Sequence, residues 1–520
     1  MPNRSTDTLF QLIKSLEKSE KRNFKLYANR NSSGEELKSV QLFDALDKME
    51  EYDEVVLLRK NETIRKLQLS NLKAHLYKQI LSSLRLINDE LNIDIQLNEQ
   101  MDHARILYNK GLYLQSLKVL DKMKDIAKAN NQTSYLQQVL FFEKSIESLY
   151  ITRSIKNRAE QLSKETTEVS NILTLSSQLS NLSLQLYSWY IENGHSRNEA
   201  EDAAVQQFFI DALGDKTSAC THFYEKLYLY QSYCWIAFIR QDFLQYYRYT
   251  QKWVNLFERE PFMIAIETGH YIKGMHNLMG SHFNLANHQK LMETLIQFEA
   301  FSNSDVVQNN INNKIQCFVY GTISTFNKHF LEGSFTEGLE MIPTLENKIK
   351  AYEIYMDRHR VLVFDYKIAC LYFGSGNYEK AIDYLNKIIN WKVDLRTDLQ
   401  CYSRLLQLIA HYELGNYEIL DSLIKSVYRF MAKMQNLSVV EEEIFKEQIF
   451  KFIRKSFQLS VKTIRPELEE LLANLKTLQN NRFETRAFIY LDIISWLESK
   501  LENIPVQEVL KRKFANKRSN

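Results

Sequence analysis

Residues 371–385, LYFGSGNYEKAIDYL, carry a pattern that recurs along the chain. Phe373 stands three residues before Gly376, Tyr378 follows two residues after it, and Ala381 lies three residues further on. A glycine just past a helix readily adopts the left-handed conformation that ends the helix. The following aromatic can pack over the turn, and the alanine lets a second helix approach the first closely. We therefore predict a helical hairpin that turns at Gly376.

The same pattern occurs at other places in the sequence. Further copies turn at Gly111, Gly333 and Gly415, and weaker copies surround Gly194, Gln241 and Ala286. An aromatic residue stands three positions before the turn in six copies: Tyr108, Phe238, Phe283, Phe330, Phe373 and Tyr412. The turn positions from Gly194 to Gly415 are 39–47 residues apart. A single hairpin cannot bury its apolar face alone, so we expect neighbouring hairpins to stack.

The composition agrees with a helical protein. The chain has 13 glycines and 5 prolines in 520 residues, whereas folds rich in strands use both residues often in turns. We predict an all-α fold, an α-solenoid of stacked antiparallel helical hairpins with helical caps at both ends. Residues 1–95 form an N-terminal domain of about three helices, residues 96–440 form the repeats, and residues 441–520 form a C-terminal cap. The basic tail of this cap, from Lys511 to Arg518, is of a kind that is commonly disordered.

The hairpins resemble the tetratricopeptide repeat (TPR), which has G-x-Y and an alanine at these offsets. The unit of that family is ~34 residues long, so the helices or loops are longer here. The resemblance implies a superhelix whose first helices line a concave groove that holds a peptide or helix of a partner protein. Carried over from Gly333, Gly376 and Gly415, the inward-facing residues are Tyr320, Ile323, Asn327, Phe330, Val363, Tyr366, Cys370, Phe373, Tyr402, Leu405, Ile409 and Tyr412.

The predicted groove is mainly apolar and aromatic. This set of residues does not contain the lysine and asparagine clamp with which some members of the family bind a terminal carboxylate. We therefore expect an amphipathic helix as the ligand, either from a partner or from the chain's own C-terminal end.

Residues 59–85 form a basic amphipathic segment. It holds seven Lys or Arg residues against one acid, Glu62, and carries an apolar stripe at helical spacing. The favoured interpretation is a cap helix that docks through this stripe, and the alternatives are contact with nucleic acid or with an acidic protein. The candidate polyanion contacts are Arg65, Lys66, Lys73, Lys78 and Arg85.

The sequence offers no convincing catalytic, cofactor or metal site. His270, His276, His282 and His288 recur every six residues, which points successive side chains in different directions on a helix, whereas zinc sites on helices use i,i+4 pairs. The five cysteines are widely spaced, without a C-x-x-C pair. No signal sequence or apolar run of ~18 residues is evident, so we expect a cytoplasmic protein without a membrane span.

Two functional hypotheses remain open. The leading one is a non-enzymatic scaffold or adaptor that binds a partner peptide or helix in the groove. The alternative is a nucleic-acid-linked regulator, in which residues 1–95 bind the polyanion and the repeats sense a partner. Bacterial peptide-responsive regulators share that general layout. The net charge of +2 gives no overall preference for a polyanion.

Overall fold

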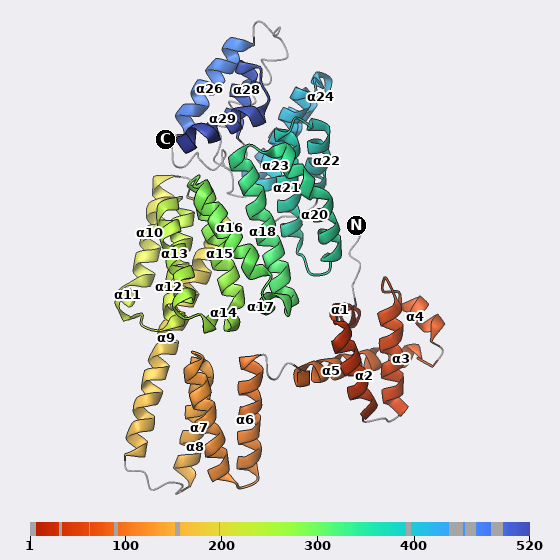
Figure 1. Ribbon diagram of the computed structural model, residues 1–520, viewed down its shortest axis with the longest axis vertical. Helices are drawn as coiled ribbons and strands as arrows, with labels where there is room; N and C mark the ends of the chain where they lie inside the picture. Colours follow the sequence, from red (N-terminus) through yellow and green to blue (C-terminus); the bar gives the residue numbers. More distant parts are fainter. Residues whose placement is uncertain are drawn as a thin grey trace. The chain divides into compact units, whose positions relative to one another are not determined.

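The described parts of the chain are helical. The computed structural model describes residues 7–30, 34–61, 63–87, 92–150, 157–196, 198–391, 397–435, 451–452, 464–479 and 492–519. Across these ranges the regular structure consists of helices, without a strand, which confirms the all-α prediction (Figure 1). The chain divides into two compact units, residues 1–169 and residues 170–520. The three-part division at residues 95 and 440 stays a prediction.

The first unit opens with five helices around one core. They are α1 (Thr8–Ser15), α2 (Lys18–Arg30), α3 (Gly34–Lys48), α4 (Glu54–Lys60) and α5 (Lys66–Ile87). We expected about three helices, and local chain breaks account for the difference. Leu16 is extended after α1, and the Asp53 side chain caps α4 by accepting hydrogen bonds from the backbone N–H groups of Val55 and Val56. Phe24 and Phe43 meet in the core with their ring centroids 4.7 Å apart.

The rest of the first unit holds α6 (Ile93–Asn109), α7 (Tyr113–Ala129), α8 (Thr133–Leu149) and the beginning of α9 (Arg158–Asn193). Helices α6 and α7 form a hairpin at Gly111, as predicted, and its φ is 77°. A second turn, at Asn131 with φ 55°, joins α7 to α8. The sequence pattern missed this turn because it has neither a glycine nor an aromatic residue three positions earlier.

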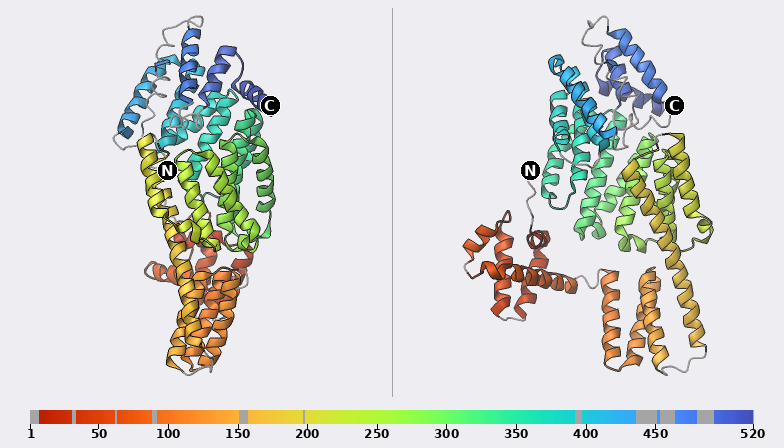
Figure 2. Two further views of the ribbon diagram at one scale, coloured as in Figure 1. Left: turned by 90° about the vertical axis from the view of Figure 1, so that its left-hand side faces the viewer. Right: turned by 180° about the vertical axis from the view of Figure 1, so that it is seen from behind.

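The second unit continues with helices that pair along the chain (Figures 1 and 2). Its first part contains α10 (Glu199–Leu213), α11 (Lys216–Ala219), α12 (Phe223–Ile239), α13 (Phe243–Arg259), α14 (Phe262–Ile266), α15 (Thr268–Asn284), α16 (His288–Ser302) and α17 (Asp305–Gln308). There follow α18 (Ile311–Glu332), α19 (Phe335–Gly338), the 3-10 turn η1 (Leu339–Met341), α20 (Ile342–Ala351), α21 (Arg358–Gly374), α22 (Tyr378–Ile389), α23 (Thr397–Glu413) and α24 (Tyr417–Gln435). The first helices α15, α18, α21 and α23 contact one another in chain order.

The hairpin turns lie at the predicted positions. Gly194, Gln241, Ala286, Gly333, Gly376 and Gly415 all have positive φ angles, between 51° and 85°. At Gly376 the backbone N–H donates to the carbonyl of Phe373 at 3.0 Å, and the N–H of Asn377 donates to Tyr372 at 2.9 Å. The Asn377 side chain then accepts from the N–H of Lys380 and begins α22. These bonds close the first helix and start the second within three residues.

The C-terminal segment adds three described helices to the second unit: α26 (Arg465–Gln479), α28 (Ile493–Glu502) and α29 (Val506–Ser519). Residues 441–450 of the expected cap lie outside the described residues. The expectation of a disordered basic tail is wrong, because residues 506–519 form a helix. Arg512 binds both carboxylate oxygens of Glu502, at 2.6 and 2.7 Å, which gives the tail charge a partner on α28.

Candidate binding groove

The predicted groove residues lie on three adjacent first helices. Tyr320, Ile323, Asn327 and Phe330 are on α18, Val363, Tyr366, Cys370 and Phe373 are on α21, and Tyr402, Leu405, Ile409 and Tyr412 are on α23. Tyr402 and Leu405 are at most 2% exposed, and Tyr366 and Phe373 are 4% and 6% exposed. These four side chains therefore contribute to the hydrophobic core. Tyr320, Ile323, Phe330, Cys370 and Tyr412 keep part of their surface exposed.

A cavity of about 2050 Å³ adjoins part of this set. On the side of the first helices its lining includes Phe330, Val363, Tyr366, Cys370 and Phe373. Across the cavity the lining includes Ile494 on α28 and Val506, Leu510 and Phe514 on α29. The structure thus brings together the predicted residues near the Gly333 and Gly376 turns. Tyr320, Ile323, Asn327, Tyr402, Leu405 and Tyr412 do not line the cavity.

The C-terminal wall is attached to α23 through one carboxylate. Trp496 on α28 donates its indole N–H to Oε1 of Glu413 at 2.6 Å, and Lys500 lies 2.6 Å from Oε2 of the same residue. The Trp496 ring also meets Tyr412 edge to face, with the centroids 6.2 Å apart. Because Trp496 is 1% exposed, the indole is a buried anchor between α28 and α23.

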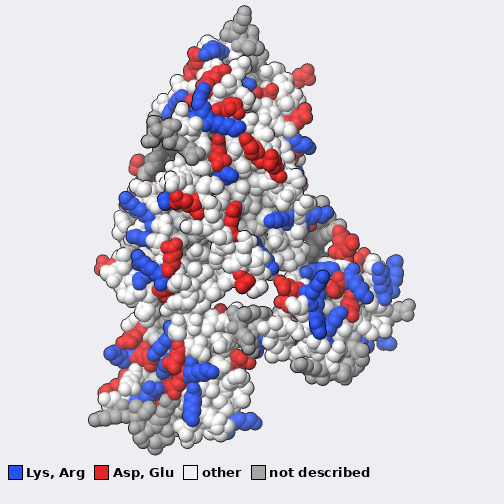
Figure 3. Space-filling view, in the orientation of Figure 1, with Lys and Arg blue, Asp and Glu red and all other residues white. Residues whose placement is uncertain are grey.

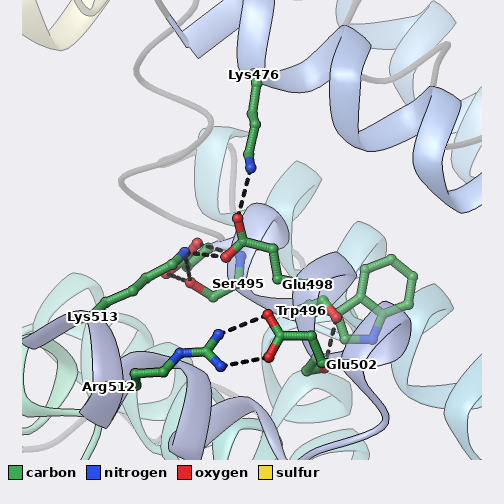
Figure 4. Close-up of polar contacts among 9 residues, drawn as sticks. Lys476, Ser495, Trp496, Glu498, Glu502, Arg512 and Lys513 are labelled. Atoms are coloured by element: carbon green, nitrogen blue, oxygen red, sulfur yellow. Dashed lines mark hydrogen bonds and ion pairs between the residues drawn. The ribbon is translucent and has the colours of Figure 1, made fainter.

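A second carboxylate ties the three C-terminal helices together (Figure 4). Glu498 on α28 lies 2.8 Å from Lys476 on α26 and 2.7 Å from Lys513 on α29. Burial raises the pKa of Glu498, but the hydrogen bonds from Lys476 and Lys513 outweigh it, so this pKa lies below its ordinary value. Helices α26, α28 and α29 therefore form one ion-paired group.

Gly333 sets how closely α29 approaches the first helices. A Cβ atom at this position would lie 2.7 Å from Cβ of Leu510 and 2.8 Å from the backbone nitrogen of Lys511. The turn also requires φ of 68°. Nearby, the hydroxyl of Thr336 donates to the side-chain oxygen of Gln507 at 2.8 Å. A glycine is needed here both for the turn and for the contact between helices.

Polar residues in the same region were missed by the sequence prediction. Lys367 on α21 donates a hydrogen bond to Oδ1 of Asn327 on α18 at 2.8 Å, so the face does contain a lysine and asparagine pair. Lys273 and His276 on α15 occupy the same offsets before Ala286 that Tyr320 and Ile323 occupy before Gly333. Applying the same offsets to the turn at Ala286, one hairpin further toward the N-terminus, would have identified Lys273 and His276.

The five candidate polyanion contacts of the first unit have different surroundings. Arg65, Lys66 and Lys78 are exposed. Lys73 lies 2.8 Å from Asp7 and also donates to the hydroxyl of Tyr52, and Arg85 lies 3.0 Å from Asp102 at the surface. Figure 3 shows Lys and Arg side chains gathered over α1–α5, with Asp and Glu among them. The apolar stripe of α5 packs into the core through Leu69, Leu76 and Ile80.

The four regularly spaced histidines have separate environments. His270 lies 3.0 Å from the side-chain amide of Gln231, and His288 lies 2.7 Å from Glu332. His282 is buried beside Tyr247, and His276 stacks on Tyr320. In the described ranges, no three His, Cys, Asp or Glu side chains are grouped to hold a metal ion.

The helices of the described ranges include none with both the length and the apolar character needed to cross a membrane.

No family model matches the chain, and no curated protein matches it either.

Proposed function

We propose that the chain is a non-enzymatic, cytoplasmic scaffold or adaptor that binds a partner helix or peptide. In this proposal the hairpins of the second unit form a TPR-like solenoid, and their first helices line the binding groove. The observation that carries it is the cavity of about 2050 Å³ beside α18 and α21. Pockets for small molecules usually hold ~300–1,000 Å³, so this space suits a larger ligand.

The chemistry of the cavity supports a helix as the ligand. Val363, Cys370 and Phe330 give α18 and α21 an apolar surface, and Leu510 and Phe514 face the same space from α29. Helix-in-groove binding uses apolar side chains at helical spacing against such a surface. The described C-terminal helices form one wall of the cavity, and Met292 and Ile296 of α16 also line it. The proposed ligand therefore lies between that wall, α16 and the first helices.

Site-specific crosslinking tests this proposal. A photoreactive phenylalanine analogue at Val363, which lines the cavity, should crosslink one discrete partner in the native host. The matched position is Ile419 on the second helix α24, which is 42% exposed and should give no such product. Mass spectrometry identifies the linked peptides. Products that join position 363 only to the chain itself, or the same partners from both positions, would contradict a partner in the groove.

A second function is favoured by the exposed side chains of Lys66 and Lys78 on α5 and of Arg65 just before it. In that proposal the first unit contacts nucleic acid, and the repeats sense a partner. The pairing of Lys73 with Asp7 and of Arg85 with Asp102 leaves fewer cations for phosphate contacts, so we place this function second.

A further inference from the structure

Four basic side chains gather on the first helices around Tyr320 of α18. Lys273 and His276 come from α15, and Arg360 and Lys367 come from α21. Lys273 and His276 occupy predicted groove positions, because they precede Ala286 by the same numbers of residues as Tyr320 and Ile323 precede Gly333. Their side chains are partly exposed, so a ligand on this face can reach them.

Aromatic side chains contact three members of this basic cluster. The His276 ring lies parallel to the Tyr320 ring, with centroids 4.0 Å apart and an interplanar angle of 15°. The ammonium of Lys273 is 5.3 Å from the Tyr320 centroid, and the nearby charge of Arg360 opposes the rise that burial causes in the pKa of Tyr320. Lys367 is 5.1 Å from the Phe330 centroid and donates to Asn327. The basic groups are therefore positioned by aromatic and amide side chains.

The basic cluster has few acidic partners in the described part of the chain. Arg360 lies 3.2 Å from Asp357, which is 56% exposed. Lys273 makes neither an ion pair nor a hydrogen bond to a described residue, and Nδ1 of His276 is buried without a hydrogen-bond partner there. Positive charge thus exceeds negative charge around Tyr320. An arrangement of this kind is costly for folding and favours a bound anion.

The lowered pKa values of three of these basic groups agree with an excess of positive charge. Burial, followed by the charge of Arg360, lowers the pKa of Lys273 to about 8. Burial likewise lowers the pKa of Lys367 to about 8. Burial and then the three neighbouring cations hold the pKa of His276 well below its ordinary value. An anion at this place would stabilise the charged forms.

We propose that this face of α15, α18 and α21 binds side-chain carboxylates of an acidic, amphipathic peptide segment. The inference rests on the proposed function and names the chemistry of its ligand. Lys367 and Phe330 border both the basic cluster and the apolar cavity, so a ligand there carries acidic and apolar side chains together. Because the cations come from two helices on either side of Tyr320, they suit several separate carboxylates better than one phosphate group.

A binding experiment on the full chain tests the inference. The probe is a blocked, fluorescein-labelled peptide of alternating glutamate and leucine pairs, and its control has glutamine in place of glutamate. Fluorescence anisotropy at low salt should show binding of the glutamate peptide alone. The double variant Lys273→Met, Lys367→Met should weaken this binding at least ten-fold, and Lys273→Arg with Lys367→Arg should retain it.

The matched control is Lys380→Met with Lys425→Met. These lysines lie on the second helices α22 and α24 and are 58% and 60% exposed, and their loss should leave binding unchanged. Equal affinity of the Lys273 and Lys367 methionine variant and the wild type would overturn the inference. Failure of the glutamate peptide to bind would also overturn it. Binding of inorganic phosphate instead, with the same dependence on both lysines, would overturn the carboxylate assignment.

The outcomes separate this inference from the proposed function. A partner crosslinked from position 363, together with peptide binding that is independent of the two lysines, overturns the inference alone. Lysine-dependent peptide binding without a crosslinked partner overturns the proposed function alone. Thermal unfolding of each variant, followed by circular dichroism, checks that the chain remains folded.

Discussion

At the scale of single residues, Gly333 and Gly376 occupy similar turns in different surroundings. Both have positive φ, 68° and 85°. A Cβ at Gly376 would meet no atom within 4 Å, whereas one at Gly333 would overlap Leu510 and the α29 backbone. The pair therefore separates the conformational requirement of the turn from the requirement of helix contact.

Gly376→Ala should lower the free energy of unfolding by about 1 kcal/mol, because alanine is strained in the left-handed region. Gly333→Ala should lower it by about 1–3 kcal/mol more, because α29 must also shift. Urea unfolding followed by tryptophan fluorescence measures both changes. Equal decreases in the free energy of unfolding for the two variants would show that α29 does not pack closely against the Gly333 turn.

Lys273 gives a prediction with a pH dependence. Its pKa is about 8 in the folded chain, against ~10.4 for an ordinary lysine. Between these values the unfolded chain binds more protons, so the free energy of unfolding rises with pH in this window. Below pH 8 the destabilisation by the partly buried charge of Lys273 is fully present.

Lys273→Met should therefore stabilise the free protein at pH 7, on the order of 1 kcal/mol. The gain should shrink as the pH approaches ~10, where the wild-type lysine is neutral in the folded chain. Urea midpoints at pH 7 and pH 10 measure it. Lys380→Met, at an exposed position, should change the midpoint little at either pH. A destabilised Lys273→Met variant at pH 7 would mean that the charge has a stabilising partner.

At the scale of elements, the local turn chemistry made the hairpins predictable. A glycine or its substitute, preceded by an aromatic residue, located the turns before α13, α16, α19, α22 and α24. The turn at Asn131 and the five-helix N-terminal group were not predicted, because an asparagine turn and short capped helices leave weak periodic signals. The basic tail in α29 forms ion pairs with Glu502 and Glu498, which are distant enough in sequence to escape a local pattern.

Helix α5 carries the prediction that separates the two functions. If the cap interpretation of α5 is right, the full chain should bind a duplex DNA or a single-stranded RNA only weakly at 150 mM salt. Replacing Arg65, Lys66 and Lys78 with glutamine should then leave partner binding in the groove unchanged. Tight binding that falls steeply with salt and is lost in this triple variant would favour the nucleic-acid-linked function.

At the scale of the whole molecule, the sequence indicated the type of fold better than the site. Scarce glycine and proline and the recurring turns sufficed for an all-α chain of hairpins. The groove residues predicted from the sequence include both core positions and cavity positions. Tyr402 and Leu405 are in the core, whereas Phe330 and Cys370 border the cavity. That distinction depends on how α28 and α29 pack, which a repeat pattern in the first helices does not encode. The basic cluster was missed because its members come from separate hairpins.

The central claim is that the first helices of the second unit form the binding face. Hydrogen–deuterium exchange of the full chain, with and without the glutamate and leucine peptide, tests it most directly. The account predicts slower exchange in α15, α18 and α21 on binding, with α22 and α24, which do not line the cavity, unchanged. Protection confined to those second helices, or to residues 1–169, would contradict it.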